Sequence, residues 1–166
     1  MCIRDSRTAP KWSVNGKWAV MYDPIAQVWN KFDGATGKVV NISDAIGYPM
    51  FVESYDKPAP APAYGIAGWT ADGNNVFLYD AYDWWKIDLT GERQPECLTK
   101  GYGRKHGKSI RKMTSNIDKD VFQKDEKVIV SLWDKDTMDE GVYQLDMKGR
   151  LRKLMEGNYV YTIHRF

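Results

Sequence analysis

The feature that most constrains the fold of this chain is an internal repeat. Residues 12–23 read WSVNGKWAVMYD and residues 69–80 read WTADGNNVFLYD, and the two segments align without a gap at an offset of 57. After each segment come an aromatic residue, an aspartate and a turn that ends in glycine, in WNKFDGATG at 29–37 and WKIDLTG at 85–91. Self-similarity at a fixed period indicates an array of like structural units.

A third and weaker copy follows the first two. It comprises VIVSLWD at 128–134 and VYQLDMKG at 142–149, and Asp134 lies 54 residues after Asp80 of the second copy. The three copies account for most of the chain, so the repeat decides its architecture.

Each copy predicts about four antiparallel strands. Asn15-Gly16 and Asp72-Gly73 supply the positive φ that a tight hairpin needs, and a further glycine closes the next hairpin before a short last strand. Apolar runs such as 76–79 and 128–130 alternate poorly, as strands do when both faces are covered. No long segment keeps the period of a helix.

Four-stranded repeats whose faces need neighbours are the sequence form of a β-propeller. We therefore predict an all-β fold, a partial β-propeller of about three four-stranded antiparallel blades in an open arc. Because closed propellers typically use about 4–8 blades, three blades leave apolar outer faces exposed. Blade-like units are expected over 10–44, 62–100 and 110–156, and the start of a further strand over 157–166.

The two ends of the chain are expected to be cut. The opening MCIRDS resembles translated adapter sequence, so we treat residues 1–6 as a non-native tail and residues 7–166 as the partial propeller. The final NYVYTIHRF stops inside a strand-like pattern. Any targeting signal would then lie outside the sequence.

Charge and hydropathy set limits on the partners. The 24 basic and 22 acidic residues leave a formal charge of +2, which gives no global reason to expect a nucleic-acid partner. No run of 18 apolar residues occurs, so no membrane span is expected.

The repeat also offers an interpretation of the abundant aromatic residues. Tyr82 and Trp84 have no clear counterpart in the first copy, so they are candidates to face a ligand cavity. Six others recur at matched positions, as packing residues do, although each could instead form a platform for a carbohydrate or another ligand: Trp12, Trp69, Tyr22, Tyr79, Trp29 and Trp85.

Two polar segments and a pair of histidines suggest a site but depart from the motifs that they resemble. The basic stretch KGYGRKHGKSIRK at 100–112 has Tyr102 where a phosphate-binding loop needs glycine, so we predict a solvated loop between blades, with anion or nucleic-acid contact as the alternative. DKDTMDE at 134–140 has Met138 at a calcium-ligand position and is predicted to be a hairpin loop. His106 and His164 stand far apart, which disfavours a zinc site. No catalytic, cofactor-binding or metal-binding residue is predicted.

Two stretches carry a resemblance to a known family. PAYGIAGWTADGNNVFLYDAYDWWKIDLTG at 62–91, followed by CLTKGYGR at 97–104, resembles the N-terminal propeller of the prolyl-oligopeptidase family of serine peptidases, with bacterial dipeptidyl-peptidase-like members most similar. VIVSLWDKDTMDEGVYQLD at 128–146 resembles the following blade. The resemblance covers most of residues 10–166.

The resemblance implies a role without catalysis for this chain. In that family a C-terminal α/β-hydrolase domain carries the catalytic triad, and the propeller restricts access to short peptides. No G-x-S-x-G motif occurs in this sequence, so no triad residue can be assigned. The resemblance implies a peptide substrate and a hydrolase domain as partners of the intact parent, and a bacterial periplasmic or secreted location. Tyr82, Trp84 and Arg104 are the candidates to face the cavity of such an intact enzyme.

The leading hypothesis is thus the non-catalytic propeller portion of a serine peptidase, which gates peptide access to a hydrolase domain absent from this chain. A stand-alone propeller that binds protein or glycan is the alternative, and a solute-binding or sensor propeller would look the same within these residues. Whether the chain is part of an enzyme stays open at this point, because a G-x-S-x-G motif downstream would separate the hypotheses.

Overall fold

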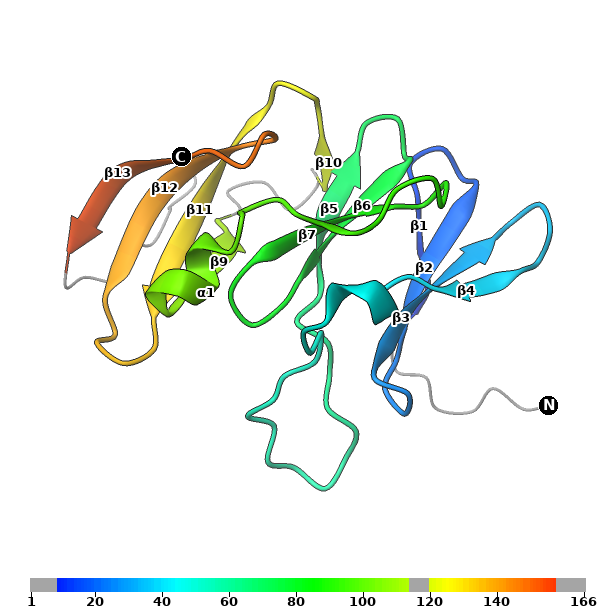
Figure 1. Ribbon diagram of the computed structural model, residues 1–166, viewed down its shortest axis with the longest axis horizontal. Coiled ribbons are helices and arrows are strands. Elements are labelled where there is room, and N and C mark those ends of the chain that lie inside the picture. Colours follow the sequence, from blue (N-terminus) through cyan, green and yellow to red (C-terminus); the bar gives the residue numbers. More distant parts are fainter. Residues whose placement is uncertain (1–8, 114–119, 158–166) are drawn as a thin grey trace.

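The computed structural model describes residues 9–113 and 120–157, and it shows an all-β chain built from three largely antiparallel sheets that lie side by side (Figure 1). The prediction of an all-β fold is confirmed. None of the three sheets closes on itself. The predicted tail at 1–6 lies outside the described residues, as does the predicted further strand at 157–166 apart from Gly157, the last residue of a strand.

The first sheet, blue to cyan in Figure 1, is a meander of four strands in sequence order. A short 3₁₀ helix, η1 (Asp44–Ile46), follows it. The strands are β1 (Lys11–Trp12), β2 (Trp18–Asp23), β3 (Val28–Asp33) and β4 (Val39–Asn41).

The second sheet, green in Figure 1, lies between the other two. It repeats the meander and gains one parallel strand, β10, beside its first strand. Its strands are β5 (Ile66–Thr70), β6 (Asn75–Tyr79), β7 (Trp84–Asp88), β8 (Glu96–Cys97) and β10 (Val121–Phe122).

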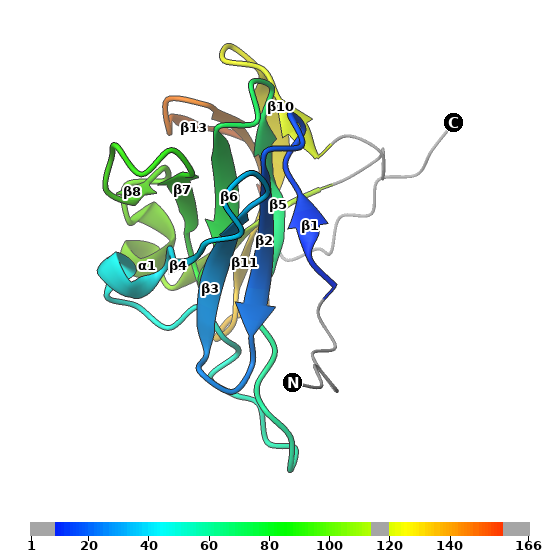
Figure 2. The same ribbon diagram turned by 90° about the vertical axis from the view of Figure 1, so that its right-hand side faces the viewer.

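The third sheet, yellow to red in Figure 1, has four antiparallel strands, and the helix α1 (Tyr102–His106) precedes it. Figure 2 views the molecule from the side of the first sheet and shows β1, β5 and β10 along one side, with β4, β8 and α1 along the other. The strands of the third sheet are β9 (Lys108–Lys112), β11 (Lys127–Asp134), β12 (Glu140–Asp146) and β13 (Leu151–Gly157).

Glycines with positive φ shape the hairpins, as the sequence predicts. Gly16 has a φ of 68° and Gly73 a φ of 69°, each in the turn between the first two strands of its sheet. Gly37, Gly91 and Gly149 also have positive φ, in the turns before β4, β8 and β13. These backbone conformations strain any residue with a Cβ atom, so the turn glycines position the strand pairs.

The second sheet is buried on both faces, and two hydrophobic cores result. In β6, Val76 and Leu78 pack in the core shared with the first sheet, whereas Phe77 and Tyr79 pack in the core shared with the third sheet. Successive side chains of a strand point to opposite faces, so β6 contributes to both cores. This arrangement explains why its sequence lacks a polar alternation.

The structure corrects the alignment of the third strands. Tyr22 pairs with Trp29 in the first sheet, and Tyr79 pairs with Trp84 in the second. The counterpart of Trp29 is therefore Trp84, and the predicted match with Trp85 is wrong by one residue. The reason is that the segment between the paired residues is two residues shorter in the second copy, which lowers the offset from 57 to 55.

Most of the predicted packing aromatics lie in the cores. Tyr22, Trp29 and Tyr79 are buried. Trp69 is only 6% exposed, whereas Trp12 at the matched position of the first sheet is 54% exposed. The difference follows from position in the stack, because the first sheet covers Trp69 and no sheet within the described residues covers Trp12. Trp85 is partly buried against the core between the first and second sheets.

The strand β10 was not predicted. It belongs to the third copy by sequence, but Trp69 N donates to Asp120 O at 2.6 Å and Ala71 N donates to Phe122 O at 3.0 Å. Gly68 of β5 permits this approach, because a Cβ atom there would lie 2.6 Å from the Asp120 carbonyl oxygen. The third copy therefore supplies a strand to the second sheet.

Candidate functional site

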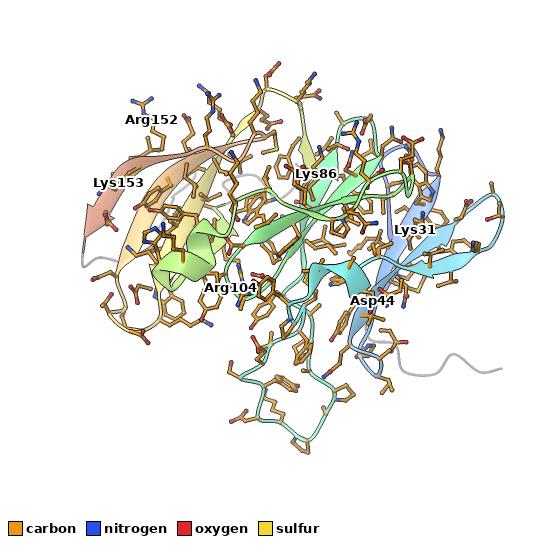
Figure 3. All side chains as sticks on the ribbon, viewed as in Figure 1. Lys31, Asp44, Lys86, Arg104, Arg152 and Lys153 are labelled. Carbon is orange, nitrogen blue, oxygen red and sulfur yellow. The ribbon has the colours of Figure 1, made fainter. Side chains whose placement is uncertain are left out.

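The candidate site is a group of charged and aromatic side chains around Arg104, which projects from α1 (Figure 3). Arg104 Nη2 donates to Asp80 Oδ2 at 2.9 Å. The guanidinium carbon lies 3.9 Å from the ring centroid of Tyr48 and 5.1 Å from that of Tyr82. We call Asp80, Asp83, Tyr48, Tyr82 and Arg104 the Arg104 cluster. It joins the turn between β6 and β7, the segment after η1 and the helix α1.

Asp80 shapes the turn that carries Tyr82. Its Oδ1 accepts from Tyr82 N at 2.7 Å and from Asp83 N at 2.6 Å, which fixes the backbone after β6. Its Oδ2 accepts from Trp85 Nε1 at 3.0 Å and from Arg104. The carboxylate is fully buried, so these charge-assisted hydrogen bonds replace the water that it loses.

Asp83 holds the start of α1 against the same turn. Its Oδ1 accepts from the Thr99 hydroxyl at 2.6 Å and from Gly103 N at 2.9 Å, and its Oδ2 accepts from Arg104 N at 3.0 Å. A Cβ atom on Gly103 would lie 2.6 Å from Tyr82 O, so glycine is needed for the helix to pack this closely. Asp83 thereby positions the backbone of Arg104.

The charge of Arg104 is secured within the cluster. Partial burial acts against the charged form, but the hydrogen bond and the charge of Asp80 raise the pKa of the Arg104 guanidinium above its ordinary value. Among the described residues, only its Nη2 donates to another side chain or to backbone. A partly exposed guanidinium with further donors, flanked by two tyrosine rings, can bind a carboxylate and stack against a planar group.

A second cation lies beside the Arg104 cluster. Lys135 Nζ, in the turn between β11 and β12, lies 5.2 Å from the ring centroid of Tyr82. Tyr82 therefore contacts cations from two separate elements, α1 and the β11–β12 turn. Cations attract the faces of aromatic rings, which favours this arrangement.

Arg111 of β9 ties the third sheet to the β6–β7 turn. Its Nη2 donates to Asp80 O at 2.7 Å and to Ala81 O at 3.2 Å, and its guanidinium carbon lies 4.8 Å from the ring centroid of Tyr79. Burial lowers the pKa of the Arg111 guanidinium, against the opposing effect of nearby Tyr79. Its Nη1 and Nη2 both donate to backbone carbonyls, so Arg111 supports the site rather than offering a ligand contact.

A separate cleft of about 590 Å³ lies on the second sheet near β10. Phe77 and Phe122 contribute apolar surface, and charged side chains of both signs, including Lys86 and Asp88, surround them. Residues from the second and third copies line it together, so the sequence pattern of any single copy carries no signal of this cleft.

The three predicted cavity-facing residues are not all brought together. Tyr82 and Arg104 contact each other in the Arg104 cluster. Trp84 lies instead in the core between the second and third sheets, where it is fully buried and its Nε1 donates to Ile110 O at 3.1 Å. Its counterpart in the first copy is Trp29, so Trp84 is a repeated packing residue. Tyr48 joins the cluster from a distant loop and was missed by sequence reasoning.

The remaining polar segments take defined structures. The basic stretch at 100–112 forms α1 and β9 and buries Ser109 and Ile110, so the predicted solvated loop is wrong. DKDTMDE at 134–140 forms the turn between β11 and β12 as predicted, where Asp134 Oδ1 accepts from Asp136 N. His106 stacks on Tyr102 with a centroid separation of 4.3 Å, and His164 lies outside the described residues.

Two features are absent from the described part of the chain. Across residues 9–113 and 120–157, no three His, Cys, Asp or Glu side chains converge as a metal site would require. Over the same residues no helix is both long and apolar enough to cross a membrane.

No family model matches the sequence, and no curated protein matches it significantly. The class of the protein is therefore described from its fold and its candidate site alone. It is an all-β chain of three neighbouring sheets, with an arginine–tyrosine cluster at the second sheet.

Proposed function

We propose that this chain is the non-catalytic propeller portion of a serine peptidase of the prolyl-oligopeptidase family, and that it restricts peptide access to a separate hydrolase domain. The observation that supports the proposal most is the repetition of a four-stranded antiparallel meander, with the middle copy covered on both faces by its neighbours. Sheets that bury both faces against like sheets are the structural requirement of a propeller. The resemblance of residues 62–104 and 128–146 supplies the family.

In this proposal the Arg104 cluster contacts the peptide. The unengaged donors of Arg104 suit a carboxylate of the substrate, and the rings of Tyr48 and Tyr82 suit an apolar or planar side chain. Asp80 and Asp83 preorganise the arginine, so little conformational entropy is lost when a ligand binds.

The test is to recover the complete reading frame and assay its product. We expect a G-x-S-x-G motif downstream of residue 166, and we expect the complete protein to hydrolyse an aminoacyl-proline or dipeptidyl chromogenic substrate. Replacement of the serine in that motif by alanine is the control for contaminating peptidase. The 166-residue chain alone should show no turnover.

The role of Arg104 is tested in the same complete protein. Arg104→Ala should raise KM for a peptide substrate with a free carboxylate more than for an amidated one, because only the former loses a charged contact. Lys124→Ala, a change in the separate cleft, is the matched control. Further repeats followed by a stop codon, without the serine motif, would favour the stand-alone binding propeller instead.

A further inference from the structure

The contact between the first and second sheets shows which side chains pack between neighbouring sheets. On the second sheet, Trp69 pairs with Val76 and Val76 pairs with Ile87, so these three residues form one row across the strands. The row packs in the core that the first sheet completes with Val20, Tyr22 and Trp29.

The same row exists on the first sheet, but it faces outward. Trp12 pairs with Ala19 and Ala19 pairs with Phe32, at the positions that correspond to Trp69, Val76 and Ile87. Val20 points into the core, so Ala19 beside it points away from the second sheet. The rings of Trp12 and Phe32 meet edge to face with centroids 6.3 Å apart. We call Trp12, Ala19 and Phe32 the leading face.

The third sheet also has an uncovered face among the described residues, on the side that points away from the second sheet. Val130 and Leu132 pack toward the second sheet, so Ser131 and Trp133 point away from it. Ser131 pairs with Val142, and Val142 pairs with Met155. Trp133 is 37% exposed and Met155 is 53% exposed. We call Ser131, Trp133, Val142 and Met155 the trailing face.

The trailing face corresponds to the surface that covers the row on the second sheet. Trp133 precedes Asp134 as Tyr79 precedes Asp80 and Tyr22 precedes Asp23, so the aromatic residue recurs at this position in all three copies. In the first two sheets that aromatic residue lies in a core against the next sheet. Trp133 of the third sheet has no next sheet to pack against among the described residues.

We propose that the leading face of one copy of this chain binds the trailing face of a second copy. The contact would repeat, between molecules, the packing that joins the first sheet to the second within one molecule. Trp12 on the leading face and Trp133 and Met155 on the trailing face are exposed apolar side chains, whereas Ala19 is only 1% exposed. Exposed apolar surface of this kind is typical of protein interaction sites. Two different surfaces meet, so the association is head to tail and continues into longer assemblies unless a ring closes. The proposal concerns the 166-residue chain and is independent of the proposed function, in which further sheets of a longer protein would cover the same two faces.

Sedimentation velocity over a wide concentration range tests the association. The unaltered chain should form dimers and then larger species as its concentration rises. Phe32→Lys on the leading face and Trp133→Lys on the trailing face should each weaken self-association by about tenfold or more. Ile25→Lys is the matched control, because Ile25 is 81% exposed in the β2–β3 turn and belongs to neither face. Circular dichroism checks that each variant is folded.

Mixing the two variants separates this geometry from others. Phe32→Lys keeps an intact trailing face and Trp133→Lys keeps an intact leading face, so the mixture should form a heterodimer and nothing larger. A mixture that stays monomeric overturns the proposal. So does a chain that is monomeric at every concentration, or a Trp133→Lys variant that associates like the unaltered chain, since the leading faces would then bind each other.

Discussion

At the scale of single residues, the most consequential group is the buried carboxylate of Asp83. It accepts three hydrogen bonds, from the Thr99 hydroxyl and from the backbone of Gly103 and Arg104. Two of the donors are backbone N–H groups of α1 itself, and Thr99 lies shortly before that helix. The position of Arg104 thus depends on a buried carboxylate.

Asp83→Ala should lower the free energy of unfolding by about 3 kcal/mol, because three donors lose their acceptor in a buried place. The measurement is urea denaturation followed by circular dichroism. Asp134→Ala is the control: Asp134 also accepts two backbone N–H groups, but in an exposed turn, so its replacement should destabilise the chain clearly less. Equal losses of unfolding free energy from the two variants would show that burial does not determine the contribution of Asp83 to stability.

Tyr79 makes the stability of the folded chain depend on pH in the alkaline range. Burial raises the pKa of Tyr79 to about 12 from 10.0, so the folded state holds the proton more tightly than the unfolded state. The stabilisation is complete below pH 10 and is lost as the pH rises through 12. Tyr79→Phe should show a shallower decline in urea midpoint over this range, with tyrosinate absorbance measured in parallel. An unchanged decline would contradict the assignment to Tyr79.

At the scale of elements, the turns of successive sheets contact one another. Asn15 Nδ2 donates to Asp72 O at 2.9 Å, so the hairpin turn of the first copy binds the equivalent turn of the second. A Cβ atom on Gly73 would lie 2.8 Å from Asn15 N. Gly73 therefore serves both its own turn and the contact between sheets.

Gly73→Ala should destabilise the chain by about 2–3 kcal/mol, through backbone strain and through the clash with Asn15. Gly37→Ala is the matched control, because its φ of 70° equals that of Gly73 within a degree and its Cβ atom would meet nothing within 4 Å. We expect about 1 kcal/mol for that variant. Thermal unfolding of both measures the difference, and similar losses would mean that the contact between the turns contributes nothing.

The sequence predicts those strands and turns that are determined by residues close to one another in the chain. Asn-Gly and Asp-Gly turns and short apolar runs specify the hairpins without reference to distant residues. The stretch at 100–112 was mispredicted because its many charges suit a loop, whereas its structure depends on Asp83, which is distant in sequence. Trp84 and Trp85 are adjacent and chemically alike, so only the paired strand shows which of them repeats Trp29.

The candidate site was predictable only in part. Tyr82 is a candidate because it has no clear counterpart in the first copy, and Arg104 because it ends a stretch that resembles the family. Tyr48 belongs to the long connection between the first two sheets, where no repeat or motif marks it. Its contact with Arg104 is a product of the tertiary fold.

At the scale of the whole molecule, the three sheets do not have equal protection. The second sheet is covered on both faces, whereas each of the other two has one face without a neighbouring sheet among the described residues. An array of units that touch only their neighbours gains stability from each interface, so a middle unit is held by two interfaces and an end unit by one.

Hydrogen exchange should reveal this order. We expect the amides of β6 to exchange most slowly, and those of β4 and β13 fastest among the strands, because edge strands of the end sheets open without disrupting both cores. Mass spectrometry of peptides after timed exchange makes the measurement. Uniform protection across the three sheets would instead show that the chain unfolds as a single cooperative unit.

The strand β10 has a consequence for how such a chain can be divided. By sequence it belongs to the third copy, yet by hydrogen bonding it completes the second sheet. The boundaries of the sequence repeat therefore differ from the boundaries of the hydrogen-bonded sheets. A chain shortened between the second and third copies would lose a strand from the sheet that it keeps, and would leave Phe77 without the ring of Phe122. Removal of the third copy would therefore leave the second sheet incomplete, whereas the four described strands of the first sheet all come from the first copy.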